Sequence, residues 1–143
     1  MKTLTLTQPW ATLVAVGAKR IETRSWSTSF RGPLAIHAAK SFPSEARALC
    51  SQKPFEDVLR SMGITVLDLP TGAVIAIAEL WRILRIDYTV SSLLPPPEPE
   101  LSFGDYRPLR YAWWLRNVHS FNPIPAKGML GLWEWSPPYP IGP

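Results

Sequence analysis

Three charged residues that could act together follow Gly17 within a short stretch: Lys19, Glu22 and Arg24. An amine and a carboxylate this close stabilise each other's charges, and a partly buried pair can share a proton and act as acid and base. Arg24 adds a planar guanidinium suited to a phosphate or a carboxylate. We therefore expect Lys19 and Glu22 to face a common cavity, with charged ends that interact directly or through one water. The alternative is an ordinary solvated turn after a helix.

The side-chain directions in this turn follow from an extended backbone, in which neighbouring side chains alternate. Ile21 is expected to point into the core, while Glu22 and Arg24 share the opposite face and Arg20 points to solvent. Replacing Lys19 with alanine is then expected to abolish ligand binding or turnover with little loss of folding stability. Arg20→Ala is the matching exposed control.

The segments on either side of the turn predict a sheet with few helices. Residues 3–7 alternate polar and apolar like a half-buried strand, and a proline followed by apolar residues at spacings of three and four predicts a helix over residues 9–17. Further strands are predicted at 33–39, 73–86, 110–116 and 130–135, helical stretches at 44–52 and 54–62, a proline-rich surface loop at 91–99, and a turn at 103–106. Prolines at 123 and 125 are expected to interrupt the link between the last two strands. Strands joined by short connections favour a mixed β-barrel over a doubly wound sheet.

The charged turn matches a known motif. It reads G-x-K-x-x-E-x-R in full, and the chain resembles the ASCH domain family of the PUA-like superfamily. Flanking blocks support the resemblance in order along the chain: Gln8-Pro9-Trp10, Arg31-Gly32-Pro33-Leu34, Ile36-His37-Ala38, Phe103-Gly104-Asp105-Tyr106, Arg110-Tyr111-Ala112-Trp113, Lys127-Gly128 and Gly131-Leu132-Trp133. The resemblance implies an α+β fold, a PUA-like mixed β-barrel with flanking short helices, formed by residues 1–143 as one domain with a cleft beside the turn.

Two functions are compatible with that resemblance. Some relatives are proposed to bind RNA, others remove the acetyl group from acetylcytidine with the motif lysine as a catalytic residue, and others are linked to RNA cleavage. The first hypothesis is therefore a module that binds RNA or a modified nucleoside, with residues for phosphate or base contact at Gln8, Trp10, Arg24, Trp26, Arg31, Asp105 and Tyr111. The alternative is a hydrolase, an amidohydrolase or ribonuclease, in which Lys19 is the nucleophile or general base and Glu22 moves the proton. For Asp105 and Tyr111, a turn cap and a barrel residue are the structural alternatives.

The distribution of charge favours a phosphate-bearing partner. The net charge is +4, and the bases concentrate in the two ends of the chain, in residues 1–40 and 107–143, around an acidic middle. If the two ends pack together as neighbouring strands, they form one basic face. Ordinary solvated charge is the alternative.

Composition excludes several other classes of function. Two histidines and one cysteine give no metal-ligand spacing, and no dinucleotide or phosphate-loop motif occurs, so we expect no metal and no cofactor. His37 is interpreted as a hydrogen-bonded core histidine, and Glu79 as the partner of an arginine. No apolar run is long enough to cross a bilayer and no signal peptide is visible, which predicts a cytoplasmic protein without a membrane partner. The oligomeric state is not readable from the sequence.

Overall fold

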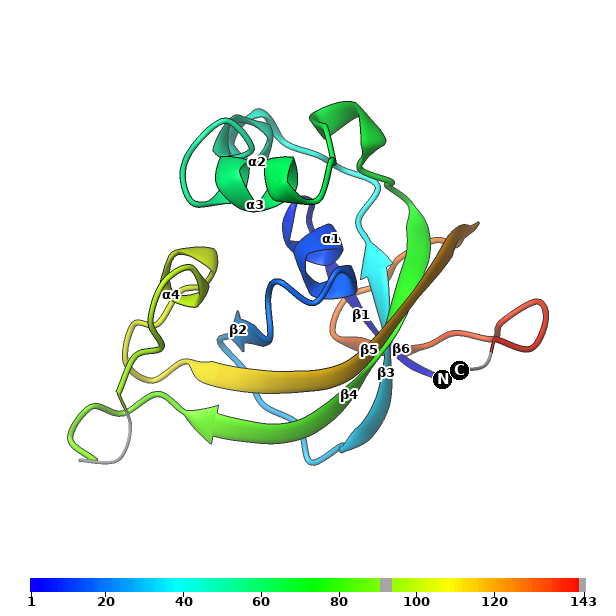
Figure 1. Cartoon of the computed structure of the whole chain (residues 1–143). Coiled ribbons are helices and arrows are strands. Elements are labelled where there is room, and N and C mark those ends of the chain that lie inside the picture. Colours follow the sequence, from blue (N-terminus) through cyan, green and yellow to red (C-terminus); the bar gives the residue numbers. More distant parts are fainter. Residues whose placement is uncertain (91–93, 142–143) are drawn as a thin grey trace.

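Six strands form one curled sheet in the computed structural model, which describes residues 1–90 and 94–141 (Figure 1). The strands are β1 (Lys2–Leu6), β2 (Ile21–Arg24), β3 (Gly32–Ala38), β4 (Ala73–Arg85), β5 (Tyr111–Pro125) and β6 (Leu132–Glu134). Their order across the sheet is β2-β5-β4-β3-β1-β6. Only the β1–β3 pairing is parallel among these neighbours. The predicted α+β class and PUA-like barrel are confirmed, in the form of a half-barrel.

The long strands β4 and β5 form the centre of the curl. β4 carries the apolar run that begins at Ala73, and its side chains fill the concave face together with those of β1 and β3. Trp113 of β5 is fully buried there, and its indole N–H donates to the Trp26 carbonyl oxygen over 3.2 Å. The loop that follows β2 is thereby fixed against the core.

Short helices cover one end of the sheet. They are α1 (Trp10–Ala15), α2 (Ser44–Leu49), α3 (Phe55–Ser61), the 3-10 turn η1 (Val66–Asp68) and α4 (Glu100–Phe103). α1 lies inside the curl, and α2 and α3 lie beyond it (Figure 1). A second core joins Leu13 of α1 to Phe55 and Leu59 of α3 and to Phe103 of α4. This core fixes the position of the chain after Phe103. None of the described helices is long and apolar enough to cross a membrane.

Most predicted elements are confirmed, with two corrections. The predicted turn at 103–106 begins later, because Phe103 is the last residue of α4. The prolines at 123 and 125 do not interrupt the last strands, since β5 continues to Pro125. Among the described residues, β2 pairs with β5 only as far as Trp114, and the rest of β5 pairs with β4 alone. The other edge of this part of β5 is therefore unpaired, and a proline, which has no backbone N–H, is tolerated at such an edge. Part of the predicted proline loop, residues 91–93, lies outside the described residues.

The two ends of the chain pack together in the sheet. β1 and β6 are neighbouring antiparallel strands at one edge of the sheet. The Lys2 ammonium lies 2.9 Å from the Glu134 carboxylate, so one of the basic residues at this edge is neutralised locally.

Candidate functional site

A cleft of about 430 Å³ opens where the end of β1, the strand β2 and the segment after α4 meet. Its charged and aromatic lining residues are Trp10, Glu22, Arg24, Trp26, Phe103, Asp105 and Arg110. Three stretches that lie far apart in the sequence therefore contribute to one site. We call this site the base cleft, after the modified base or RNA segment that the family resemblance leads us to expect there.

The strand β2 presents its charged residues to the base cleft. Ile21 is buried on the other side, in a small cluster with Ile86 and Ala112, while Glu22 and Arg24 both line the cleft. Arg20 is exposed. The alternation predicted from the sequence is confirmed at these four positions.

Lys19, Glu22 and Arg24 form a continuous ion-paired network. Lys19 Nζ lies 3.4 Å from Glu22 Oε1 and also donates to the Ile21 carbonyl oxygen. Arg24 Nη2 lies 3.0 Å from Glu22 Oε2, and the same nitrogen donates to the Thr5 carbonyl oxygen over 2.8 Å. Both oxygens of the Glu22 carboxylate are therefore held, one by each cation.

The predicted contact between Lys19 and Glu22 is confirmed, but Lys19 does not line the cleft. Its side chain is 0% exposed, against 12% for Glu22. The backbone N–H groups of Ala18 and Lys19 both donate to the Leu13 carbonyl oxygen over 2.9 Å, which folds the chain tightly at the end of α1. Lys19 consequently lies behind Glu22 and supports it from the protein interior.

A second charged pair faces Arg24 from the segment after α4. The Asp105 backbone N–H donates to the Thr23 hydroxyl over 2.9 Å, and Arg110 Nε donates to the Asp105 carbonyl oxygen over 3.1 Å. Hydrogen bonds from the Arg107 side chain, together with the charge of Arg110, lower the pKa of Asp105 to about 2. The Asp105 carboxylate is therefore ionised throughout the physiological range.

The close approach of this segment to β2 requires a glycine. A Cβ atom on Gly104 would lie 2.7 Å from the ring of Tyr106 and 3.2 Å from the Thr23 methyl group. A side chain at this position would push the segment away from β2 and separate Asp105 from Thr23.

Two tryptophans, Trp10 and Trp26, contribute indole rings to the base cleft. The Trp10 indole N–H donates to the Phe103 carbonyl oxygen over 2.8 Å, and the Trp10 ring packs edge-on against Phe55. Trp26 packs edge-on against Trp113 with ring centroids 4.9 Å apart. Both rings are thus held in place before any ligand binds.

Besides Lys19, three residues predicted to contact RNA or the substrate lie outside the base cleft. Gln8 is buried, and its amide bonds the Thr12 hydroxyl, the Thr12 N–H and the Pro70 carbonyl oxygen, so it anchors the start of α1 instead. Arg31 is exposed and donates to two carbonyl oxygens of its own loop. Tyr111 starts β5 and packs against the main core.

The sequence did not single out Arg110, although it lies in the same sequence block as Tyr111. Only one of two adjacent positions faces a given side, and the block alone does not show which one. Thr5 and Thr23 were also missed. Thr5 contributes a carbonyl oxygen that accepts from Arg24, and Thr23 contributes a hydroxyl that accepts from the Asp105 backbone N–H. Nothing in the sequence indicates such contacts.

Two structural interpretations are confirmed. His37 is buried, with Nδ1 3.1 Å from the Thr5 hydroxyl and Nε2 2.7 Å from the Ala126 carbonyl oxygen. Burial lowers the pKa of His37, while its bond to Ala126 acts in the opposite direction. Glu79 is paired with Arg116 over 3.0 Å. No group of three or more metal-binding side chains is found among the residues that the structure describes.

Comparison with known proteins identifies the family. The family model described as ASCH domain matches residues 4–125. The chain belongs to the ASCH domain family. Activating signal cointegrator 1 from Homo sapiens and from Mus musculus are each 36% identical to it over 78 residues, which cover 54% of this chain. The match spans only 13% of the length of these curated relatives.

A solved ASCH structure supports the fold. The crystal structure of ASCH from Zymomonas mobilis matches with a TM-score of 0.51 at 17% sequence identity, and the match covers 87% of this chain and 72% of that one. The half-barrel with its short helices is therefore the PUA-like fold of an ASCH domain.

Proposed function

We propose that this ASCH domain binds RNA or a modified nucleoside by taking one base into the base cleft. The observation that carries the proposal is the ion-paired Glu22 and Arg24, which line a cleft of about 430 Å³ together with two fixed tryptophans. This volume lies within the range of about 300–1,000 Å³ that is typical of small-molecule sites.

The charged groups of the cleft complement the edge of a base. Carboxylates accept hydrogen bonds from exocyclic amino groups, and guanidinium groups donate to base carbonyls or phosphates. Arg24 is held through Nε and Nη2, and Arg110 through the corresponding two nitrogens. Within residues 1–90 and 94–141, Nη1 of neither arginine donates a hydrogen bond to a protein acceptor. Each guanidinium therefore has a fixed orientation and N–H groups left for a ligand.

The aromatic residues supply the apolar part of the interaction. A base that stacks on an aromatic side chain gains about 1–3 kcal/mol, largely independently of its identity. Trp10 and Trp26 line the cleft and are already fixed by their own contacts. Little side-chain entropy is then lost when a base binds.

Fluorescence anisotropy with a labelled single-stranded RNA tests the proposal. Arg24→Gln removes a charged donor from the cleft, and a hydrogen bond to a charged group contributes about 1.5–3 kcal/mol, so affinity is expected to fall about 10- to 100-fold. Arg31→Gln is the matched control, because Arg31 is an arginine of the same part of the chain that does not line the cleft. The affinity should also decrease with salt, by a log–log slope of roughly −0.7 for each phosphate neutralised. Absence of RNA binding at low salt, or equal effects of the two variants, would contradict the proposal.

Amide hydrolysis in the same cleft is less well supported. A lysine nucleophile must reach the substrate carbonyl, and Lys19 lies behind Glu22 with no exposed side-chain surface. Incubation with acetylcytidine, with cytidine release as the readout, separates the two functions. Release of cytidine that disappears in Glu22→Gln would establish the hydrolase instead of the binding module.

A further inference from the structure

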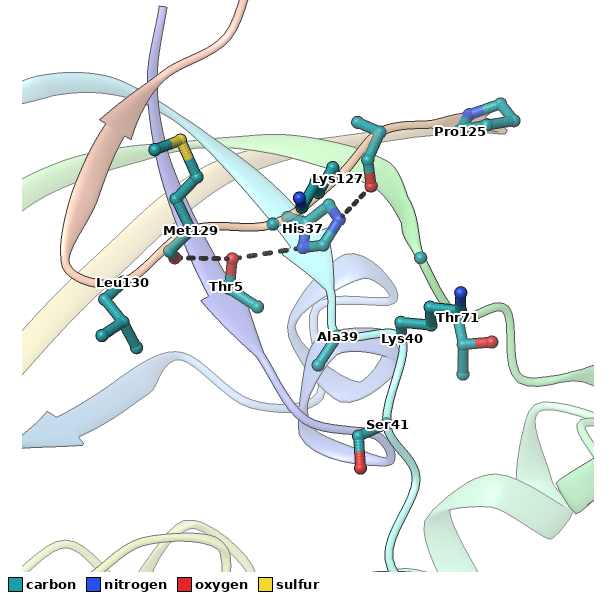
Figure 2. Close-up of a pocket in the computed structure, with 13 residues that line it drawn as sticks. Thr5, His37, Ala39, Lys40, Ser41, Thr71, Pro125, Lys127, Met129 and Leu130 are labelled. Atoms are coloured by element: carbon teal, nitrogen blue, oxygen red, sulfur yellow. Dashed lines mark hydrogen bonds between the residues drawn. The ribbon is translucent and has the colours of Figure 1, made fainter.

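A second and larger hollow shares Thr5 of β1 with the base cleft. Its volume is about 1,020 Å³, and the residues that matter for its chemistry are Thr5, His37, Lys40, Lys127, Met129 and Leu130 (Figure 2). They come from β1, from β3 and the residue pair that follows it, and from the segment between β5 and β6. We call it the lysine hollow.

The lysine hollow carries positive charge without compensation. Lys40 and Lys127 are both exposed, and neither forms an ion pair within the described part of the chain. No aspartate or glutamate is among the residues that line it. The base cleft differs in this respect, because each of its arginines is paired with a carboxylate. An anion is therefore the ligand that the lysine hollow suits.

The backbone that carries the two lysines is held firmly. Figure 2 shows the His37 ring between Thr5 and the chain that leads to Lys127, bonded on both sides. The Trp133 indole N–H donates to the Thr5 hydroxyl over 3.1 Å. On the opposite side, the Ala39 N–H, one residue before Lys40, donates to the Leu6 carbonyl oxygen over 2.9 Å. The lysine stems thus begin at fixed points on both sides of the hollow.

Thr5 connects the two sites. It lines both the base cleft and the lysine hollow. Its carbonyl oxygen accepts the hydrogen bond from Arg24, and its hydroxyl contacts His37 within the hollow. The two sites are therefore adjacent at Thr5.

We propose that the lysine hollow binds the sugar–phosphate backbone of the RNA strand next to the base in the cleft, with Lys40 and Lys127 each contacting a phosphate. This inference rests on the proposed function of the base cleft. The apolar side chains of Met129 and Leu130, 62% and 99% exposed, lie at the same hollow and offer contact surface to a neighbouring ribose or base. The domain then reads one base in the cleft and holds the adjoining strand through its phosphates.

The test compares two doubly substituted proteins of equal charge. The hollow variant carries Lys40→Gln and Lys127→Gln, which remove both cations of the hollow. The control variant carries Lys53→Gln and Arg85→Gln, which remove two exposed cations that line neither site. Anisotropy is measured with a labelled single-stranded RNA heptamer over a range of salt concentrations, and binding of a single nucleoside is measured by calorimetry.

The hollow variant is expected to bind the heptamer about ten-fold more weakly, with a salt slope reduced by about 1.4, that is about 0.7 for each of two phosphates. Its affinity for the nucleoside should equal that of the wild type. The control variant should keep most of the wild-type salt slope. Equal heptamer binding by both variants would overturn the inference and leave the proposed function of the base cleft standing.

A second measurement keeps the inference testable if RNA binding itself is absent. Tripolyphosphate is titrated into the wild-type protein, and backbone amide shifts are followed by NMR. Shifts at Lys40, Gly72 and Gly128 that disappear in the hollow variant would show that the hollow binds phosphate. Without RNA binding, this phosphate-binding part of the inference would stand, while its assignment to an RNA strand would fail together with the proposed function. No shifts at these amides, together with no RNA binding, would refute both.

Discussion

Lys19 is the residue for which the structure most changes the expected effect of a mutation. From the sequence, Lys19→Ala is expected to remove function with little effect on stability. The structure places the whole side chain in the interior, with its ammonium group between the Ile21 carbonyl oxygen and the Glu22 carboxylate. A substitution here must therefore cost folding free energy as well.

The size of that cost follows from the contacts that remain. Removing one partner of a buried ion pair typically costs about 3–5 kcal/mol, because the other charge is left uncompensated. In this protein Arg24 still neutralises Glu22 over 3.0 Å, so Lys19→Met should cost less. We expect about 1–3 kcal/mol, the cost of leaving a buried polar group such as the Ile21 carbonyl without its partner. Lys19→Ala also loses three buried methylene groups at about 0.8 kcal/mol each, so its cost should be larger by about 2 kcal/mol.

Urea denaturation measures these differences through the transition midpoint at constant slope. Arg20→Ala is the control, because the Arg20 side chain is exposed and surface substitutions usually stay within about 0.5 kcal/mol. The predicted order of stability is wild type and Arg20→Ala first, then Lys19→Met, then Lys19→Ala. If Lys19→Met is as stable as Arg20→Ala, the interior position of the ammonium group and its bonding role are refuted.

Three further effects are expected. Burial lowers the pKa of His37, so the unfolded state binds the proton more readily than the folded state. The unfolding free energy should therefore decrease as the pH falls below the ordinary histidine range, by at most about 1.4 kcal/mol per pH unit. This slope should be absent in His37→Gln, and a slope that persists in that variant contradicts the assignment. Hydrogen bonds from Arg107 lower the pKa of Asp105 to about 2, so this carboxylate should stabilise the fold fully above the ordinary aspartate range. That contribution to the unfolding free energy should be lost as the pH falls towards 2. The unfolding free energy of Asp105→Asn should lack this pH-dependent loss. A Cβ atom on Gly128 would lie 2.6 Å from His37 Cε1, so Gly128→Ala should lower the unfolding free energy by about 1–3 kcal/mol, and an unchanged melting temperature would show that this contact is looser than described.

The local pattern of the sequence determined the elements and the side-chain directions within them. The polar–apolar alternation of residues 3–7 predicted β1, and the alternation after Lys19 placed Glu22 and Arg24 on one face. Both are properties of a short extended backbone, which any fold must satisfy. The complete G-x-K-x-x-E-x-R motif likewise indicated the family that the comparison establishes.

Tertiary packing decided which of these residues reach a ligand. Gln8 and Lys19 are polar, yet the turns at the two ends of α1 direct both into the interior, where backbone oxygen atoms accept their hydrogen bonds. Arg110 and Asp105 meet Thr23 only because α4 packs onto the second core. The contacts of Gln8, Asp105 and Arg110 join segments about 60 to 90 residues apart, and a short window of sequence does not contain the information that determines such contacts.

The lysine hollow arises only from the folded chain. Lys40 and Lys127 carry no motif in common, and they line one hollow because β3 and the end of β5 both pair with β4. Thr5 is an ordinary strand residue in the sequence, whereas in the structure its carbonyl and hydroxyl groups serve two adjacent sites. The sequence by itself determined which charges the protein carries. The curl of the sheet decided which of them lie together, because strand pairing joins residues irrespective of their distance along the chain.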